Sequence, residues 1–441
     1  MARSPAGIVA LYRDAFGGLP RLTWLLCLAA FLNRCGAMVV PFLGLYAKQR
    51  FGYSASEAGV VLAIYGAGAV TGSFAGGWLT DRLGPVRLQV LALGLAGVWM
   101  LSMTQVLVPG WLEASVFVLV VLNEAFSPGS VTAVASSVPA ALRRKALSLN
   151  RLMLNLGWAF GPTIGGYLVA VDFRLMFVVD GATCGLAALF LATCLGGYDP
   201  RPAPPVAGER PGRPFRDRHF VWLMLANVIV LLAFMQYFTT GARVFEDQGF
   251  DTRAIGWFLA VNPVMIVLFE MPVVHALRDR PALPVVAAGS LVVGIGYLLL
   301  LPAFGGAGIV VAMAVVAGGE LLQMPLLGAH VNDHAPKHAR GAYNGAHGMT
   351  FSVGQILAPL GGGPLYDWLG AAALWWACGA LGAIAAAMFW RAARHAPPPP
   401  DAGPLTPTAG PVAAMPTAPP AAPPPATGTR SPRRMPRTRR P

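Results

Sequence analysis

Ionisable side chains near the middle of long apolar segments are the residues of this sequence best suited to chemistry. Arg34, Glu124 and Glu320 each lie near the middle of such a segment, where a helix of the roughly 20 residues needed to cross a bilayer would be at mid-depth. A charge at that depth is costly, so it marks a functional site by default. We expect these groups to bind a solute or to couple its binding to protons, together with polar side chains at similar depth, namely Asn33, Asn123, Gln236, Tyr237 and Gln323.

The two glutamates should differ in protonation. Burial favours the neutral carboxyl, whereas a nearby cation favours the carboxylate. Glu124 has Arg34 at matching depth, so we expect it to stay ionised and to orient groups around it. Glu320 has no such cation in its half of the chain, so we expect it to carry the proton, with Glu270 and Asp180 as the next candidates. The alternative is a structural network in which Arg34 and Glu124 only hold helices together.

Motifs for enzymes and metal sites are missing from the sequence. It has no nucleotide-binding P-loop, no Cys/His ligand spacing and no nucleophile–base arrangement. We therefore expect no enzymatic activity, no cofactor and no metal, and we expect an ion gradient, of protons, as the energy source. The cysteines are odd in number and lie in apolar segments, so we expect small buried side chains rather than disulfides at Cys27, Cys35, Cys184, Cys194 and Cys378.

The composition of the chain indicates a membrane protein. The 441 residues are 56% hydrophobic and 12% charged, whereas soluble domains carry about 25% charged residues. Lipid is the environment in which so apolar a surface is stable. Apolar runs of spanning length follow one another along the chain, and they predict an all-α membrane protein with twelve transmembrane helices at 22–47, 57–80, 86–108, 111–137, 146–170, 174–196, 220–242, 253–277, 283–304, 307–330, 340–365 and 370–391.

Two polar segments divide the chain. Residues 197–218 form a Pro-rich basic linker, and residues 396–441 form a tail of Pro, Ala and Thr with a basic end. Neither segment can bury a core, so we expect both to be largely disordered. The division leaves an N-terminal six-helix half, residues 1–196, and a C-terminal six-helix half, residues 219–395.

The basic residues predict an orientation. The net charge is +13, and most Lys and Arg lie in the linker, the tail and alternate loops, which the positive-inside rule places in the cytoplasm. We therefore expect a multi-pass protein of the cell membrane with both termini in the cytoplasm. The same scattered distribution argues against a nucleic-acid partner, which would require a concentrated basic patch.

The two halves of the chain echo each other. TDRLGPVRLQ (80–89) matches RDRPALPVVA (278–287), and Glu124 matches Glu320 at a similar spacing. Internal repeats of this kind are typical of secondary transporters, whose substrate site lies between the repeats near the middle of the membrane. Glycine stripes in spans two, five and eleven support the same architecture, because small residues let helices approach closely in lipid.

The segment GGWLTDRLGPVR (76–87) resembles the loop between helices two and three of the major facilitator superfamily. Pro85 and Val86 depart from the basic pair that is usual there. The resemblance covers about residues 20–391 and implies two six-helix pseudo-repeats around a central cavity. It also implies a conformational role in which Asp81 accepts bonds from the eleventh helix, although the segment could instead act only in topology. The matching positions are Gly77, Leu79, Asp81, Arg82, Gly84 and Arg87.

A second motif lies in the fifth predicted helix. GWAFGPTIGG (157–166) is similar to the Gly-Pro-rich motif of the drug:proton antiporter branches of that superfamily, through Gly157, Gly161, Pro162 and Gly165. Those branches often carry an Arg in the fourth helix, where this sequence has Asn123 and Glu124. The family resemblance further implies that helices one, four, seven and ten line the central cavity.

These observations predict a secondary transporter. The leading function is proton-coupled efflux of a small hydrophobic or amphiphilic compound, as in multidrug transporters. The alternatives are proton-coupled uptake of a small nutrient or peptide-like solute, and a ligand sensor that keeps a transporter fold. The partners that we expect are the solute, protons and the lipid bilayer, with the protein acting as a monomer.

Overall fold

The computed structural model describes residues 16–105, 108, 110–198, 200, 213–277, 279–301, 305–336 and 339–395. The predicted tail and most of the predicted linker lie outside the described residues. Secondary structure within the described part is helical, with no strand. The helices are α2 (Arg21–Cys35), α3 (Val39–Phe51), α4 (Ala55–Leu83), α5 (Pro85–Met103), α6 (Trp111–Glu124), α7 (Phe126–Ser136), η1 (Ala140–Leu142), α8 (Arg143–Val169), α9 (Arg174–Leu195), η2 (Pro214–Arg216), α10 (Arg218–Phe234), η3 (Met235–Tyr237), α11 (Thr240–Asp247), α12 (Thr252–Leu277), α13 (Ala282–Leu298), α14 (Gly305–His334) and α15 (Arg340–Arg394).

Nine helical segments of the described part are long and apolar enough to cross a membrane. Three further features concern the other predicted spans. α8 coincides with the predicted span 146–170 but is less apolar, α13 has only 17 residues, and the last two predicted spans lie on α15, which is interrupted at Gly370. The count of twelve crossings and the pseudo-repeat therefore stay predictions.

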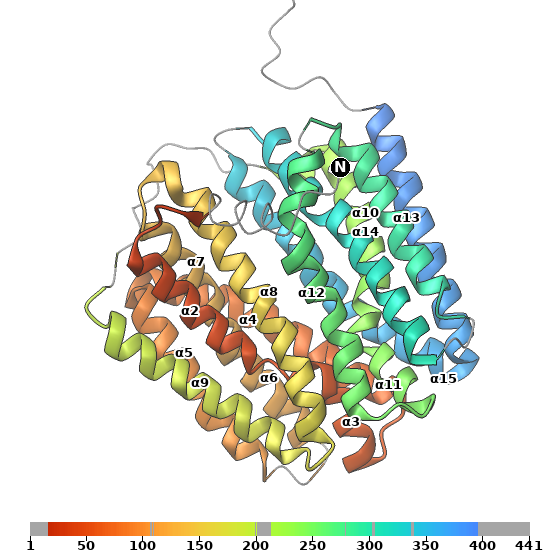
Figure 1. Ribbon diagram of the computed structural model, residues 1–441, viewed down its shortest axis with the longest axis horizontal. Coiled ribbons are helices and arrows are strands. Elements are labelled where there is room, and N and C mark those ends of the chain that lie inside the picture. Colours follow the sequence, from red (N-terminus) through yellow and green to blue (C-terminus); the bar gives the residue numbers. More distant parts are fainter. Residues whose placement is uncertain are drawn as a thin grey trace, which may run out of the picture. The chain divides into compact units, whose positions relative to one another are not determined.

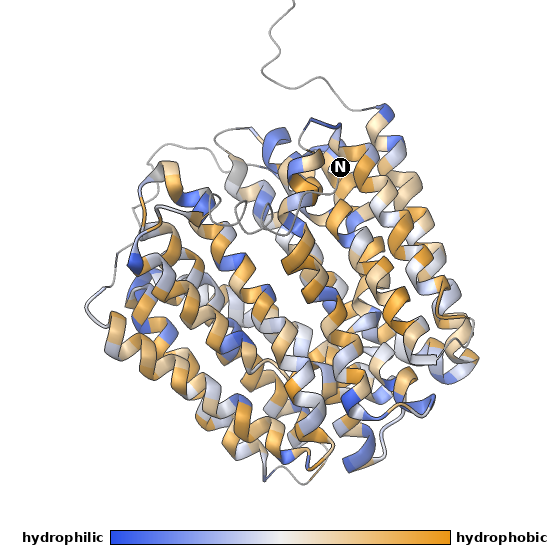
Figure 2. Ribbon diagram, in the orientation of Figure 1, coloured by the Kyte–Doolittle hydropathy of each residue, from blue (hydrophilic) through white to orange (hydrophobic). Residues whose placement is uncertain are grey.

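The surface of the helices is rich in apolar side chains. Phe74, Leu186 and Trp368 are large hydrophobic residues that are more than half exposed. Figure 2 shows hydrophobic residues along most of α9, at one edge of the view, while many hydrophilic residues lie near the helix ends. A surface of this kind suits hydrocarbon rather than water. The chain is a multi-pass membrane protein.

The predicted span 22–47 is broken into two helices. α2 and α3 are separated by residues 36–38. Asp180 of α9 is only 1% exposed, and its carboxyl accepts hydrogen bonds from the backbone N–H groups of Met38 and Val39. The first N–H groups of a helix have no partner within it, so this carboxyl caps α3 from a neighbouring helix. Asp180 therefore holds a structural joint in the first span.

Two helix pairs join the first part of the chain to the second. α4 packs on α15, and α8 packs on α12, which runs beside it in Figure 1. Glycines bring both pairs into backbone contact. A Cβ atom at Gly59 would lie 2.5 Å from the carbonyl oxygen of Pro359, and one at Gly256 would lie 2.5 Å from that of Pro162. We call these two pairs the seams, because they bring the two parts of the chain into backbone contact.

The glycine motif of α8 packs this helix against α2 and the joint that follows it. A Cβ atom at Gly157 would lie 2.6 Å from Cβ of Arg34, and one at Gly161 would lie 3.1 Å from the carbonyl oxygen of Ala37. Larger side chains at these positions would separate the helices. The motif is therefore a packing surface, formed by Gly157, Gly161 and Gly165.

The cysteines follow the prediction with one exception. Cys27, Cys184 and Cys378 are buried, and Cys35 is partly buried. Cys194 is exposed, so its predicted burial is wrong. It lies beside the exposed Ala192 and Thr193 near the end of α9, on a face that turns away from the core.

Replacing Gly157 with alanine should lower thermal stability. The new Cβ atom would lie 2.6 Å from Cβ of Arg34, and overpacking of this kind costs about 1–3 kcal/mol. Gly94→Ala in α5 is the matched control, because a Cβ atom there meets no described atom within 4 Å. Scanning fluorimetry of both purified variants in detergent measures the unfolding midpoint. An unchanged midpoint for Gly157→Ala would contradict the close packing of α2 on α8.

Candidate functional site

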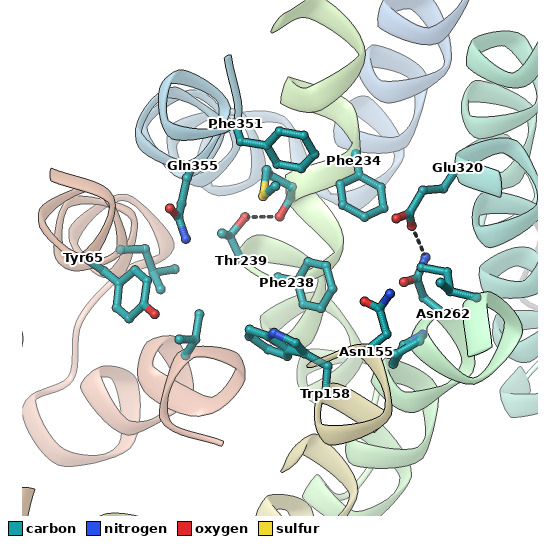
Figure 3. Close-up of a pocket in the computed structure, with 15 residues that line it drawn as sticks. Tyr65, Asn155, Trp158, Phe234, Phe238, Thr239, Asn262, Glu320, Phe351 and Gln355 are labelled. Atoms are coloured by element: carbon teal, nitrogen blue, oxygen red, sulfur yellow. Dashed lines mark hydrogen bonds between the residues drawn. The ribbon is translucent and has the colours of Figure 1, made fainter. Parts of the chain in front are cut away.

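An internal cavity of about 280 Å³ lies between helices from both parts of the chain. This volume is close to the lower limit of roughly 300 Å³ for small-molecule sites. Figure 3 shows its walls, with side chains that converge from α4, α8, α10, α12, α14 and α15. The lining residues are Val40, Leu62, Tyr65, Asn155, Trp158, Phe234, Met235, Phe238, Thr239, Asn262, Pro263, Ile266, Glu320, Phe351 and Gln355.

Glu320 places a carboxyl group in the cavity wall. Its Oε2 accepts a hydrogen bond of 2.7 Å from Nδ2 of Asn262 (Figure 3), and the residue is 7% exposed. No cation forms an ion pair with Glu320 in the part of the chain that the structure describes. The amide of Asn262 can donate to the carboxylate or to the carbonyl oxygen of the neutral acid. The site can therefore hold this group in either protonation state.

Aromatic rings make most of the cavity wall apolar. Trp158 of α8 meets Phe238 edge to face, with ring centroids 5.8 Å apart, and Phe234 and Phe351 lie close by in Figure 3. Such walls with a few polar groups suit an amphiphilic solute, and aromatic faces also attract organic cations. Besides Glu320 and Asn262, polar atoms come from Tyr65, Asn155, Thr239 and Gln355.

Arg34 and Glu124 form the ion pair that the sequence predicts. Nη1 and Nη2 of Arg34 donate to the same oxygen, Oε1 of Glu124, at 3.3 and 3.2 Å. The two side chains are 13% and 16% exposed. Cζ of Arg34 lies 5.9 Å from the ring centroid of Trp158, which lines the cavity. The pair therefore lies behind the aromatic wall and does not itself line this cavity.

Three other predicted residues act as ties between helices and do not line the cavity. Gln236 donates to a backbone carbonyl of α15 at 2.7 Å, and the hydroxyl of Tyr237 donates to a backbone carbonyl of α12 at 2.7 Å. Nε2 of Gln323 donates to Oδ1 of Asn227 at 2.8 Å. These donor groups are thus used within the protein, while Oε1 of Gln236 is buried and has no hydrogen-bond partner among the described groups.

The two asparagines beside the ion pair keep unused polar atoms. Asn33 is 2% exposed and accepts a hydrogen bond from the thiol of Cys184 at 3.6 Å. Its Nδ2 and Oδ1 of Asn123 are buried, and neither has a hydrogen-bond partner among the described groups. Buried polar atoms without partners are costly. These two atoms are therefore buried polar groups that the described residues leave unsatisfied.

The cavity is lined by a wider set of helices than the family resemblance implies. α3, α10 and α14 contribute, as expected for spans one, seven and ten, but α4, α8, α12 and α15 contribute as well. Neither α6 nor α7 of the predicted fourth span supplies a lining residue. The expectation that spans one, four, seven and ten line this cavity is therefore wrong in part. The reason is that α4 and α8 lie closer to the second part of the chain, on which they pack.

The sequence interpretation missed Asn155, Trp158 and Gln355. The ionisable and polar groups at mid-depth in spans one, four, seven and ten predict the site, whereas these three residues lie in spans five and eleven. The sequence does contain a pattern that points to these residues, which is their position beside the close-packing glycines. Trp158 lies within the glycine motif of helix five, Asn155 lies two residues before that motif, and Gln355 directly follows a glycine of the stripe in span eleven. Polar side chains beside a close-packing seam would have indicated the cavity.

The loop motif lies at the end of α4 that is remote from its backbone contacts with α15. Asp81 is exposed, and no hydrogen bond or ion pair to it is recorded within the described residues. Arg82 stacks over Trp78, with 3.8 Å between Cζ and the ring centroid. Gly84 has a φ of +89° and ends the helix, Gly77 is open to its surroundings, and Arg87 contacts neighbouring groups. The predicted contact of Asp81 with the eleventh helix stays a prediction.

The opposite end of that seam carries a charged cluster. Nζ of Lys48, on α3, donates to Glu246 and Asp247 of α11, at 2.6 Å in each case. Arg243 donates to Asp247 at 3.1 Å and to the backbone carbonyl of Tyr53 at 3.1 Å. These bonds link residues nearly 200 positions apart in sequence. They join the two parts of the chain at this end.

Asp367 extends this connection to α4. Its carboxyl accepts hydrogen bonds from the backbone N–H groups of Ala55 and Ser56 at 3.1 and 2.7 Å, and from the hydroxyl of Ser56 at 2.5 Å. The carboxylate therefore caps the N-terminus of α4 from α15, where the helix dipole favours a negative charge. We call the residues that make these bonds the seam cluster, namely Lys48, Ser56, Arg243, Glu246, Asp247 and Asp367.

A second ion pair lies on the other seam. Arg151 of α8 contacts Glu270 of α12 at 3.4 Å. Glu270 is eight residues beyond Asn262 on the same helix, so it lies about two turns away. Among the described residues Glu270 forms an ion pair with Arg151, whereas Glu320 feels the charge of Arg151 without forming an ion pair, which distinguishes the two candidates for proton transfer.

The fold and the cavity define a helical membrane protein with a hollow between its helices, close in volume to a small-molecule site. The profile described as Major Facilitator Superfamily matches residues 26–359 and 244–437. This chain belongs to the major facilitator superfamily, and it is a membrane transport protein.

Relatives with assigned names support this class. The Uncharacterized MFS-type transporter YqjV of Bacillus subtilis (strain 168) is 24% identical and matches 79% of this chain and 87% of its own. The Na(+), Li(+), K(+)/H(+) antiporter of Planococcus maritimus is 25% identical over 77% and 88%. The Multidrug resistance protein MdtH of Enterobacter sp. (strain 638) is 23% identical over 75% and 82%.

A solved structure gives the same fold. The crystal structure of a POT family transporter in complex with 5-aminolevulinic acid aligns with a TM-score of 0.72. The alignment covers 86% of this chain and 97% of that one at 15% identity. At this identity the likeness concerns the fold alone.

Glu124→Gln should destabilise the protein, because it leaves the Arg34 guanidinium without its counter-charge. Breaking a buried pair in this way costs about 3 kcal/mol. Adding Arg34→Gln to the same chain should recover part of the loss, since the second change removes the remaining charge. The yield of monodisperse protein and its unfolding midpoint in detergent measure both effects. A double variant no more stable than Glu124→Gln alone would show that the pair does not carry this stability.

Proposed function

We propose that the protein is a proton-coupled secondary transporter that exports a small hydrophobic or amphiphilic compound, and that Glu320 is its coupling group. The observation that carries the proposal is the place of Glu320 in the wall of an aromatic-lined cavity. Its hydrogen-bond partner is the neutral Asn262, and no ion pair with it is recorded among the described residues.

In this proposal the proton and the solute act on one carboxyl group. When Glu320 is neutral, the cavity holds no net charge and its burial costs little. When Glu320 loses its proton, the buried carboxylate is costly unless a partner stabilises it. A solute with a cationic or hydrogen-bond-donating group supplies that partner. Binding of the solute then favours release of the proton, so that the two exchange across the membrane.

Access to the cavity alternates, in this proposal, as two six-helix halves rock about the seams between α4 and α15 and between α8 and α12. The seam cluster holds one end of the α4–α15 seam together. When the halves rock, the loop motif around Asp81 would form contacts that hold the other end together instead. The distribution of basic residues supports placing both termini in the cytoplasm and the seam cluster on the outer side.

The direction of transport is supported by two kinds of likeness. The glycine motif of α8 resembles that of drug:proton antiporters, and two named relatives are a multidrug resistance protein and a cation/proton antiporter. Export of a compound in exchange for protons accounts for both. The transport assays distinguish export from the two alternatives, which are uptake with protons and ligand sensing.

Glu320→Gln should abolish transport driven by a pH gradient but leave counterflow of the same solute. The amide keeps the shape of the side chain and cannot exchange a proton, so the solute still crosses but is not driven. The assay follows accumulation of a fluorescent amphiphilic cation in inside-out proteoliposomes with an imposed pH gradient, and then counterflow without one. Glu57→Gln is the matched control, because Glu57 caps the N-terminus of α4 and glutamine also serves in a capping box.

Three results would contradict the proposal. Uphill accumulation by Glu320→Gln would move the coupling group elsewhere, with Glu270 as the next candidate. Movement of solute out of the vesicles with protons, rather than into them in exchange, would indicate uptake in the cell. Binding without counterflow in the wild-type protein would indicate a sensor.

Asp367→Asn should weaken the seam cluster and increase opening at that end. The variant removes the negative charge at the N-terminus of α4 and one acceptor of the Ser56 bonds. Spin labels at Arg50 and Gln248, both exposed, report the distance across the cluster after the native cysteines are replaced. We expect the fraction of molecules with a longer distance between the two spin labels to increase several-fold relative to the wild type.

The control for this measurement is Asp333→Asn, which removes an exposed carboxylate near the other end of the bundle, on α14. It should leave the distance distribution unchanged. If Asp367→Asn also leaves the distribution unchanged, the seam cluster does not hold this end closed.

A further inference from the structure

A second hollow lies on the α4–α15 seam, away from the internal cavity. It is a groove of about 600 Å³ between Phe74 of α4, the short helix η2 and residues 342–349 of α15. Its lining is mostly apolar, with two arginines at one side. The lining residues are Phe74, Arg213, Pro214, Phe215, Arg216, Ala342, Gly345, Ala346 and Met349.

The two arginines of the groove provide a positive charge that the described residues do not neutralise. Arg213 and Arg216 are exposed, and neither has a hydrogen bond or ion pair recorded in the described part of the chain. The neighbouring Asp217 is engaged elsewhere, since it accepts bonds from the N–H of Phe220 at 3.0 Å and pairs with His334 at 2.7 Å. The groove therefore keeps two guanidinium groups available.

The carboxylate of Asp217 stays ionised in this arrangement. Burial acts to raise the pKa of Asp217, but the hydrogen bonds from Phe220 and His334 outweigh it and hold the pKa below its ordinary value. The hydroxyl of Tyr343, at 3.2 Å, also faces this carboxylate, and His219 lies close enough to interact with its charge. The Asp217 charge is thus satisfied by α10, α14 and α15 and does not need the arginines.

The apolar part of the groove is open. Phe74 and Phe215 are each 67% exposed, and Met349 is 48% exposed. A Cβ atom at Gly345 would meet no described atom within 4 Å. Phe215 lies between the two arginines in sequence, which is the pattern of a segment at a membrane interface, where aromatic rings lie beside basic groups that reach the headgroups. The groove thus presents apolar and cationic surfaces side by side.

The groove occupies the place where α4 and α15 separate. The two helices are in backbone contact at Gly59 and Pro359, and a Cβ atom at Gly66 would lie 3.1 Å from the backbone nitrogen of Ile356. The same antiparallel register, continued along α4, brings Phe74 opposite Ala346. There the helices line a groove, and a Cβ atom at Gly345 or at Gly77 would meet no described atom within 4 Å. An occupant of the groove would keep this end of the seam apart.

We propose that this groove binds an anionic phospholipid, with its phosphate on Arg213 and Arg216 and the start of an acyl chain along Phe74, Phe215 and Met349. The bound lipid would act as a wedge that stabilises the conformation in which α4 and α15 are separated at this end. This inference does not depend on which solute the cavity takes or on how transport is coupled.

The chemistry of the groove favours a lipid over a free anion. Guanidinium groups bind phosphate through paired hydrogen bonds, and basic pockets between transmembrane helices bind anionic headgroups. A free phosphate would use the arginines only and leave the apolar lining exposed. A lipid covers both surfaces at once.

Native mass spectrometry of the purified full-length protein tests the inference. Dioleoyl-phosphatidylglycerol and dioleoyl-phosphatidylcholine are added separately, and the bound fraction is measured for each. We expect the wild type to retain the anionic lipid preferentially. Arg213→Gln combined with Arg216→Gln should weaken its affinity roughly 30-fold, because each arginine at a membrane surface contributes about a factor of five.

Two further variants separate the groove from general charge. Arg218→Gln combined with Arg391→Gln removes the same charge from exposed arginines outside the groove and should retain the lipid. Gly345→Leu fills the groove without changing charge and should lose the lipid. All variants must elute as the wild type does in size-exclusion chromatography. If the double glutamine variant of Arg213 and Arg216 does not elute in this way, Arg213→Lys combined with Arg216→Lys takes its place. The lysines keep the charge but cannot form the paired hydrogen bonds, so the affinity for the lipid should fall a few-fold.

The outcomes are decisive in each direction. Equal retention of the two lipids by the wild type, or unchanged retention after the Arg213 and Arg216 substitutions, would overturn the site. Displacement of the lipid by inorganic phosphate at equal concentration would show that the headgroup charge alone is bound, which would also overturn the lipid assignment. None of these results depends on Glu320 or on transport.

Discussion

The cost of a charge in hydrocarbon controls the arrangement of this protein. Three buried or partly buried sites among the described helices show how this cost is met: an ion pair, a helix cap and a neutral amide at a cavity. Arg34 binds Glu124 at 3.2 Å, and Asp180 binds the first N–H groups of α3. Glu320 instead accepts one hydrogen bond, from Asn262. A carboxyl in that setting can lower its cost by taking up a proton, and the proposed coupling role of Glu320 rests on this difference.

Close helix packing gives these charges their positions. The glycines of α8 place its backbone against α2, so that Trp158 lies between the Arg34–Glu124 pair and the cavity. The glycines of α4 and α12 bring the two parts of the chain into contact, and the cavity forms beside those contacts. The small residues therefore fix the distances between helix backbones, and those distances determine which polar groups come into contact.

Much of this could be predicted from the sequence, and the limits have physical causes. Hydrophobic runs and charge depth predicted the helical membrane fold and the Arg34–Glu124 pair, because burial cost depends on residue type and position along the chain. The break between α2 and α3 was not predictable in the same way, since it depends on Asp180 from a helix nearly 150 residues later. Gln236 and Tyr237 were at suitable depth, but helix rotation turns their polar atoms toward neighbouring backbones. Asn155 and Gln355 reach the cavity because their helices lie on the seams, which depth alone does not reveal.

The joint between α2 and α3 has a mechanical consequence. α3 is a rigid rod of 13 residues, pinned at its start by Asp180 and bearing Lys48 near its far end, roughly 14 Å away along the axis. A tilt of about ten degrees at the joint would displace Lys48 by about 2 Å, comparable to the 2.6 Å that separates its ammonium group from Glu246. On the other side of the joint lies the C-terminal end of α2, which carries Arg34. A small rotation of this short helix would therefore connect the Arg34–Glu124 pair with the seam cluster.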